Sequence, residues 1–142
     1  MIYYKCQHFK IEELVDRRTF EQWGEKAWMF FQPKALMSLD NIRVYFGKPV
    51  TVNNWCFGGM SENRGLRPPY SVIGADYSQH RYGNAFDIDI ENVNAEDARQ
   101  TIIKLKDSSL FYHITALEIE IPYIHFDCRN IMNRILLIPR PK

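Results

Sequence analysis

The chain has 142 residues, a formal net charge of +1, 46% hydrophobic residues and 25% charged residues. This length predicts a single domain spanning residues 1–142, and the composition is that of an ordinary soluble globular protein. A near-neutral charge without a basic run disfavours nucleic-acid binding, and no apolar run approaches the length of a membrane span. We therefore expect neither nucleic acid nor a membrane as a partner. We also expect a monomer.

The cysteines indicate a reducing compartment. Cys6, Cys56 and Cys128 are odd in number and widely spaced, which disfavours a disulfide framework. The N-terminal residues contain no long apolar run of the kind that a secretory signal needs. We expect the protein to be made and kept in the cytoplasm unless another factor releases it.

The N-terminal third of the chain is expected to be helical. Apolar residues recur at helical spacing from about residue 11 to residue 31, with a break near residues 16–19. Pro33 ends that segment. A second helix is expected over residues 34–46, where Gly47 fits a helix stop. The aromatic residues along these helices are interpreted as core packing.

A short strand and a long irregular segment follow. Residues 49–53 have the composition of a strand. Residues 54–79 hold several Gly and Pro residues, and a loop this long in a small domain is typical of a functional or disordered segment. The aromatic residues within it argue against disorder.

The C-terminal half is predicted to form most of a sheet. Residues 85–90 alternate between an apolar face and a face that carries Asp87 and Asp89. A helix is expected to begin at Asn94 and to reach about Asp107. Three further strands are expected: residues 114–121, 123–128 and 135–138. The fold class is therefore α+β, with N-terminal helices packed on a small, mostly antiparallel sheet.

Two histidines and a carboxylate suggest a metal site. His80 and Asp87 lie seven residues apart, which would be roughly 23 Å along a straight strand, so the chain must bend between them. Gly83 allows that bend at little cost. With His125 on a neighbouring strand, the set would suit a catalytic zinc that keeps a fourth position for water. Asp127 shares the face of His125 and is expected to orient an imidazole.

These residues also match a family pattern. The pattern S-x-H-x-x-G-x-A-x-D is matched by Ser78, His80, Gly83, Ala85 and Asp87. His125 and Asp127 match its closing H-x-D. Over roughly residues 50–129 the chain resembles the zinc D-Ala-D-Ala carboxypeptidases and phage endolysin peptidases, which share a fold with the Hedgehog signalling domain. The resemblance implies a Hedgehog-like or DD-peptidase-like fold.

The resemblance also assigns roles. It implies three zinc ligands: His80, Asp87 and His125. Gly65-Leu66-Arg67-Pro68 is similar to the G-Y-R-P element of the family, which implies that Arg67 binds and polarises the substrate. A guanidinium can stabilise an oxyanion or hold the terminal carboxylate of a peptide. Arg64, three residues earlier, is the competing choice.

At the position of the general base the chain departs from the family. Many members place a glutamate three residues before the last histidine, and this chain has Pro122 there. Glu118 and Glu120 lie seven and five residues before His125, so on one straight strand both would face away from it. A bulge or turn at Pro122 could bring one of them round. Glu120 is preferred because it is nearer, with Glu118 close behind.

The leading hypothesis is a zinc-dependent peptidase with Zn²⁺ as its cofactor. Its substrate would be the stem or cross-link peptides of peptidoglycan, cleaved as a D-Ala-D-Ala carboxypeptidase or an endopeptidase. The protein would be encoded by a phage or prophage, and would act on the cell wall after release or from the virion. The alternative, motivated by Pro122, is a non-catalytic virion-associated or cell-wall-binding module of the same fold. A metal-dependent nuclease is a weaker idea, opposed by the near-neutral charge.

Overall fold

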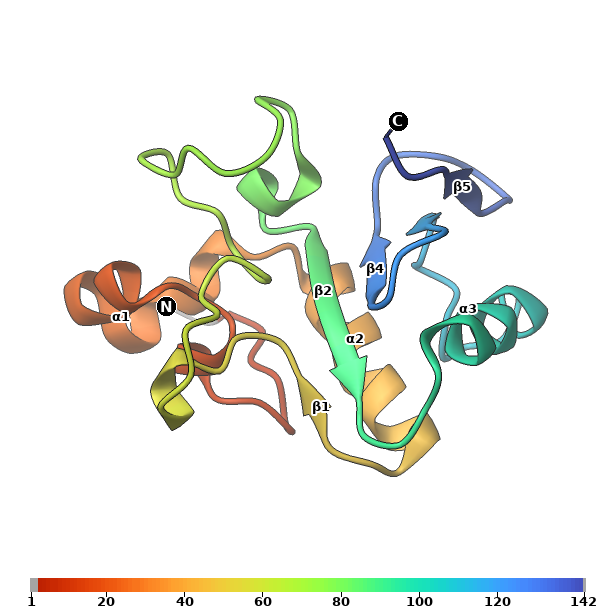
Figure 1. Cartoon of the computed structure of the whole chain (residues 1–142), viewed down its shortest axis with the longest axis horizontal. Coiled ribbons are helices and arrows are strands. Elements are labelled where there is room, and N and C mark those ends of the chain that lie inside the picture. Colours follow the sequence, from red (N-terminus) through yellow and green to blue (C-terminus); the bar gives the residue numbers. More distant parts are fainter. Residues whose placement is uncertain (1–2, 142) are drawn as a thin grey trace.

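The computed structural model of the protein describes residues 3–141 (Figure 1). Its helices are α1 (Arg17–Trp23), α2 (Pro33–Phe46) and α3 (Ala95–Lys104). Its strands are β1 (Val50–Thr51), β2 (Ala85–Ile90), β3 (Ala116–Glu118), β4 (Ile124–Asp127) and β5 (Leu136–Ile138). Short 3₁₀ helices are formed by Ile11–Glu13, Gly24–Phe30, Trp55–Phe57 and Gln79–Tyr82. None of the helices in this part of the chain is long and apolar enough to cross a membrane.

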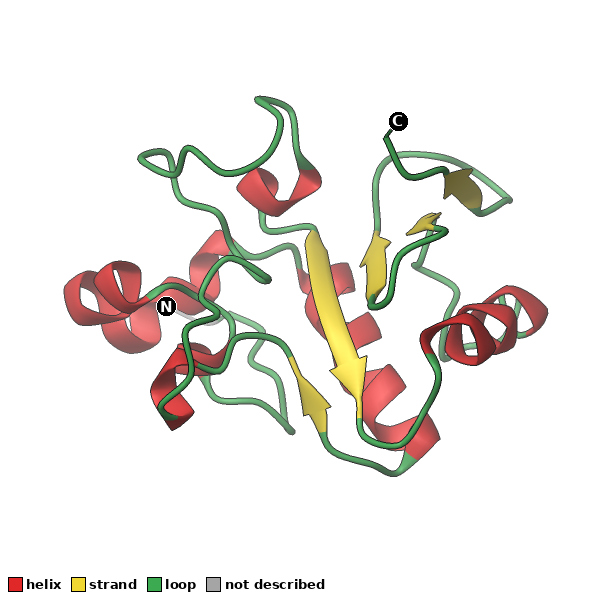
Figure 2. Cartoon of the chain, in the orientation of Figure 1, coloured by secondary structure: helices red, strands yellow, loops and turns green. Residues whose placement is uncertain are grey.

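The strands form one sheet, in the order β1-β2-β4-β3-β5. Every neighbouring pair is antiparallel except β3 and β5, which run parallel. Figure 1 shows α2 behind β2 and β4, and Figure 2 shows the strands at the centre with helices around them. The predicted α+β class, with early helices and a mostly antiparallel sheet, is confirmed.

The alternation of β2 separates the core from the site. Phe86, Ile88 and Ile90 are buried in the hydrophobic core, where the ring of Phe86 stacks on Phe31 at 5.6 Å between centroids. Ala85 and Asp87 belong to the opposite face, because successive strand residues point to opposite sides of a sheet. The apolar face and the acidic face predicted for this strand are thus both present.

Helix α2 has regular sequence signals at both ends. Pro33 occupies its first turn, where the missing N–H has no helical partner to lose. Gly47 ends the helix in the left-handed conformation, with φ of +63°. The helix therefore begins one residue earlier than expected, with the proline that was assigned to the end of the preceding segment.

Several expected elements are shorter in the structure. The strand expected over residues 49–53 is reduced to Val50–Thr51, and the helix expected to reach about Asp107 ends at Lys104. Residues 11–31 are broken into two 3₁₀ helices and α1, with the C-cap of α1 at Gly24. The strand expected over residues 114–121 ends at Glu118, because Glu120 adopts φ of +65° and the chain turns before β4. Strands β3 and β4 therefore form an antiparallel hairpin, and this turn decides which glutamate reaches the site.

Candidate metal centre

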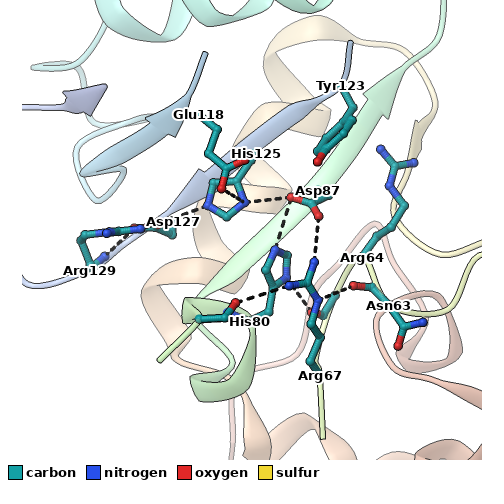
Figure 3. Close-up of polar contacts among 12 residues, drawn as sticks. Asn63, Arg64, Arg67, His80, Asp87, Glu118, Tyr123, His125, Asp127 and Arg129 are labelled. Carbon is teal, nitrogen blue, oxygen red and sulfur yellow. Dashed lines mark hydrogen bonds and ion pairs between the residues drawn. The ribbon is translucent and has the colours of Figure 1, made fainter. Parts of the chain in front are cut away.

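Two side chains from one short segment, His80 and Asp87, and a third from a distant strand, His125, meet on one face of the sheet (Figure 3). Asp87 on β2 lies directly opposite His125 on β4 in the antiparallel register, so their side chains share a face. His80 reaches the same point from the 3₁₀ helix Gln79–Tyr82, which precedes β2. One ligand atom from each of the three lies within 4.8 Å of the others. We call this group the His-Asp-His triad.

The bend between His80 and Asp87 depends on Gly83. Its φ is +64°, a conformation that favours glycine, and a Cβ at this position would collide with the backbone of Phe30. Ser78 begins the same turn, and its hydroxyl accepts a hydrogen bond from the His80 N–H at 3.3 Å. The serine and glycine of the sequence pattern therefore shape the turn that presents the histidine.

Hydrogen bonds on the outer side of each imidazole orient the two rings. Nδ1 of His80 lies 2.9 Å from the carbonyl oxygen of Gly65, and Nε2 of His125 lies 3.0 Å from Oδ2 of Asp127. Both acceptors require an N–H on that nitrogen, so the inner nitrogens, Nε2 of His80 and Nδ1 of His125, face Asp87. The expectation that Asp127 orients an imidazole is confirmed.

The inner donor atoms fit a zinc ion. Oδ1 of Asp87 lies 3.3 Å from Nε2 of His80 and 2.8 Å from Nδ1 of His125. Ligands of a tetrahedral zinc stand roughly 3.3 Å from one another, and two imidazoles with one carboxylate form a typical set for a catalytic site. The side chains of the triad can therefore hold the ion, and the chain supplies an outer hydrogen-bond partner to each ring.

The charges of the triad respond to burial and to close partners. Burial raises the pKa of Asp87, but hydrogen bonds from His125 and His80 outweigh it and hold that pKa well below its usual range. Burial lowers the pKa of His125, but hydrogen bonds to Asp127 and Asp87 prevail and raise it to about 9. Without metal, the triad is thus a carboxylate beside a protonated imidazole, and an ion must displace that proton.

Of the two candidate arginines, the structure brings Arg67 into the cleft. Its guanidinium lies 3.4 Å from Oδ2 of Asp87 and also donates to the carbonyl of Asn63 at 3.0 Å. Asp87 can therefore turn Oδ1 towards the imidazoles while Arg67 holds Oδ2. Arg64 instead forms an ion pair with Asp89 at 2.7 Å and does not line the cleft.

Of the two candidate glutamates, the structure brings Glu118 to the triad. Its Oε1 lies 3.9 Å from Nδ1 of His125, and its side chain is 32% exposed. Leu117 pairs with Phe126 in the antiparallel β3–β4 hairpin, so Glu118 comes opposite His125 at the next position. These two side chains share the face of the sheet opposite to that of Leu117 and Phe126. Glu120 is exposed in the turn and does not line the cleft. The odd spacing to His125 applies to a single strand and not to this hairpin.

The triad opens into a cleft of about 530 Å³. Such a volume falls in the range of small-molecule sites. The cleft is also lined by Arg67 and Ser78 from the loop before β2, by Glu118, Tyr123 and Arg129 in and around β3 and β4, and by Arg140 after β5. The cleft therefore holds the triad together with three arginines and one glutamate.

Arg129 was not anticipated from the sequence. Its guanidinium binds both oxygens of Asp127, with Nε to Oδ1 at 2.8 Å and Nη2 to Oδ2 at 2.5 Å. Burial raises the pKa of Asp127, but the hydrogen bonds from Arg129 and His125 outweigh burial and lower that pKa to about 2. Arg129 follows the end of β4 by two residues, and the spacing of two from Asp127 is the sequence signal that could have indicated this contact.

A two-histidine, one-carboxylate centre in an open cleft is typical of zinc hydrolases. A family model described as Peptidase M15 matches residues 7–116. The chain belongs to this peptidase family, the M15 family of zinc D-Ala-D-Ala carboxypeptidases, as its motifs had indicated. Neither the comparison with curated proteins nor the comparison with solved structures gave a match.

The region matched by the family model contains only part of the metal-site motif. It includes the N-terminal helices, which lay outside the resemblance drawn from the motifs, and it includes His80 and Asp87. It ends at Ala116, the first residue of β3, so Glu118 and His125 lie beyond it. The place of these two residues at the site rests on the strand register and on their contacts within the cleft.

Proposed function

We propose that this protein is a zinc-dependent peptidase that hydrolyses peptide bonds in the stem or cross-link peptides of peptidoglycan. The observation that carries the proposal is the convergence of the His-Asp-His triad on an open cleft, in a chain of the M15 family. When bound, a zinc ion polarises the scissile carbonyl and lowers the pKa of a coordinated water. The remaining requirements are a proton acceptor and a cation near the reacting carbonyl.

Glu118 is the proposed general base. Its carboxylate lies 3.9 Å from a triad nitrogen and is exposed to the cleft, where a substrate and its attacking water would meet. From this position it would accept a proton from the water and then deliver it to the leaving amine. Glu120 has no comparable position, because it is exposed in the turn and does not line the cleft.

Arg67 is the proposed electrostatic partner of the carbonyl oxygen. A guanidinium carries five N–H donors, and Arg67 uses three of them on Asn63, Ser78 and Asp87. The other two are available to a substrate in the cleft, where they would stabilise the negative charge that develops on the carbonyl oxygen. The contact with Asp87 fixes the guanidinium before the substrate arrives.

The proposal is tested with purified, zinc-loaded protein and peptidoglycan fragments. We expect new amine termini, and we expect Glu118→Gln to lower kcat by about 10² to 10⁴ while the bound zinc stays unchanged. Glu120→Gln is the matched control, with the same chemical change outside the cleft, and should keep its kcat. Mass spectrometry of the products separates release of a single terminal D-Ala from cleavage within a cross-link.

Two outcomes would contradict this. If the native protein releases no amine termini while another M15 peptidase does so in parallel, the proposed activity is wrong, and the non-catalytic module becomes the better reading. If Glu118→Gln keeps full kcat, the base has been misassigned. The expectations of a single domain, a monomer and a phage or prophage origin stay predictions.

A further inference from the structure

Three arginines line the cleft, and two of them are held by the protein's own carboxylates. Arg67 pairs with Asp87, and Arg129 binds both oxygens of Asp127. Arg140 is exposed and, among residues 3–141, forms no hydrogen bond or ion pair with another side chain or backbone group. The described part of the cleft therefore contains one guanidinium that is free to bind a ligand.

The backbone holds Arg140 close to the reacting end of the cleft. Strand β5 pairs with β3 so that Ile138 lies opposite Glu118, and the Ile138 carbonyl accepts a 2.9 Å backbone hydrogen bond that closes this pairing. Arg140 follows two residues later, between Pro139 and Pro141. Proline fixes its own φ and disfavours a helical backbone in the residue before it. The guanidinium is thus presented on a short, stiff arm that leaves the sheet beside the proposed base.

We propose that Arg140 is a specificity residue that binds a carboxylate of the peptide substrate, an inference that rests on the proposed function. A free guanidinium forms its strongest contacts with carboxylates, often through two parallel hydrogen bonds. A stem peptide offers two such groups, the carboxylate of its last residue and the α-carboxylate of a γ-linked glutamate. Recognition of the first favours carboxypeptidase action, and recognition of the second places a bond further along the stem at the triad.

The test uses the pentapeptide L-Ala-γ-D-Glu-L-Lys-D-Ala-D-Ala in four forms: unmodified, amidated at the terminus, amidated at the glutamate, and amidated at both. Binding is measured by calorimetry with zinc-loaded protein that carries Glu118→Gln, so that hydrolysis does not interfere. We expect Arg140→Ala to weaken binding of the unmodified peptide about tenfold. Amidation of the recognised carboxylate should cause the same loss when Arg140 is present and no further loss in its absence.

Arg134→Ala is the matched control, because Arg134 is also an exposed arginine but does not line the cleft. It should bind all four peptides as the parent protein does. Equal affinity of the parent and the Arg140→Ala protein overturns the inference, and so does a loss of the same size for all four peptides. Cleavage of the pentapeptide by native protein, together with such a result, removes the inference and leaves the proposed function intact. If native protein neither binds the pentapeptide nor releases amine termini from peptidoglycan fragments, the proposed function falls, and the inference falls with it.

Discussion

The side chains of the His-Asp-His triad are 2–8% exposed, whereas the side chain of Glu118 at the rim of the same cleft is 32% exposed. The triad atoms are also tied to specific partners, while Arg140 on the rim has none among the described residues. The difference separates two tasks. Two paired strands and the 3₁₀ turn that precedes β2 fix the positions that can hold a metal, and the chain at the strand ends supplies the groups that would act on a substrate.

The largest effect is expected where the triad itself is broken. Asp87→Ala removes its only carboxylate and leaves Arg67 without its acidic partner. Loss of an outer hydrogen-bond partner alone costs roughly 10- to 100-fold in metal affinity, so loss of a ligand should cost more than about 100-fold. Competition with a coloured chelator measures the zinc affinity.

Asp89→Ala is the control for that experiment. Asp89 lies on the same strand and the same face as Asp87, but it is exposed and pairs with Arg64 instead of a histidine. It should bind zinc as the native protein does. Equal affinities of the two variants would mean that the metal is held elsewhere.

A smaller loss of zinc affinity is expected when the outer hydrogen-bond partner of His125 is changed. Asp127→Asn keeps the size of the side chain but removes the charge that accepts the His125 N–H and binds Arg129. We expect zinc affinity to fall by about 10- to 100-fold, with the triad otherwise intact. If this variant binds zinc with native affinity, the hydrogen bond from His125 to Asp127 is not needed to position the triad.

The smallest effect, counted per unit of pH, is a change in zinc affinity with pH. Because the pKa of His125 is raised to about 9 in the metal-free protein, zinc must displace a proton at lower pH. The apparent affinity should therefore fall about tenfold per unit as the pH drops below that value. Titrations with a pH-independent competitor measure the slope, and a flat profile down to neutral pH contradicts it. In Asp127→Asn the break should move to lower pH, because the main hydrogen bond that raises the pKa is weakened.

The raised pKa of His125 also affects the folding stability of the metal-free protein, which should decrease as the pH rises while the zinc affinity increases. A histidine whose pKa is higher in the folded state stabilises that state below its unfolded value, near 6.5, and this contribution is lost as the pH rises through the folded value. The chelator-treated protein should therefore lose stability between about pH 6.5 and 9, which denaturant titrations can follow. With zinc bound, this loss should be smaller, since the proton has already been displaced.

Much of the fold follows from local patterns. The bounds of β2 could be predicted because apolar and polar residues alternate along it, with the apolar side chains in the core and Asp87 at the site. The end of β3 could not, since the turn depends on a positive φ at Glu120, where the sequence has no glycine to signal it. Contacts made only in the folded chain decide such positions.

Some residues of the site could likewise be predicted from the sequence, and others could not. His80, Asp87 and His125 could be found from spacing, because residue type and chain bend constrain them together. The choice between Glu118 and Glu120 depends on the register of two strands, which a count of residues along one strand does not reveal. Arg140 depends on the parallel pairing of β5 with β3, a contact between segments about twenty residues apart that no local pattern encodes.

The alternation of β2 also limits how such a chain can change during evolution. Insertion of one residue in this strand would turn Asp87 towards the space beneath α2 and Phe86 towards the cleft, because a slip of one position exchanges the two faces. A single event would damage the core and the triad together, so selection on either preserves both. The turn before β4 and the segment after β5 escape this constraint. Descendants of one ancestor could therefore acquire new substrates at the rim while inheriting the triad unchanged.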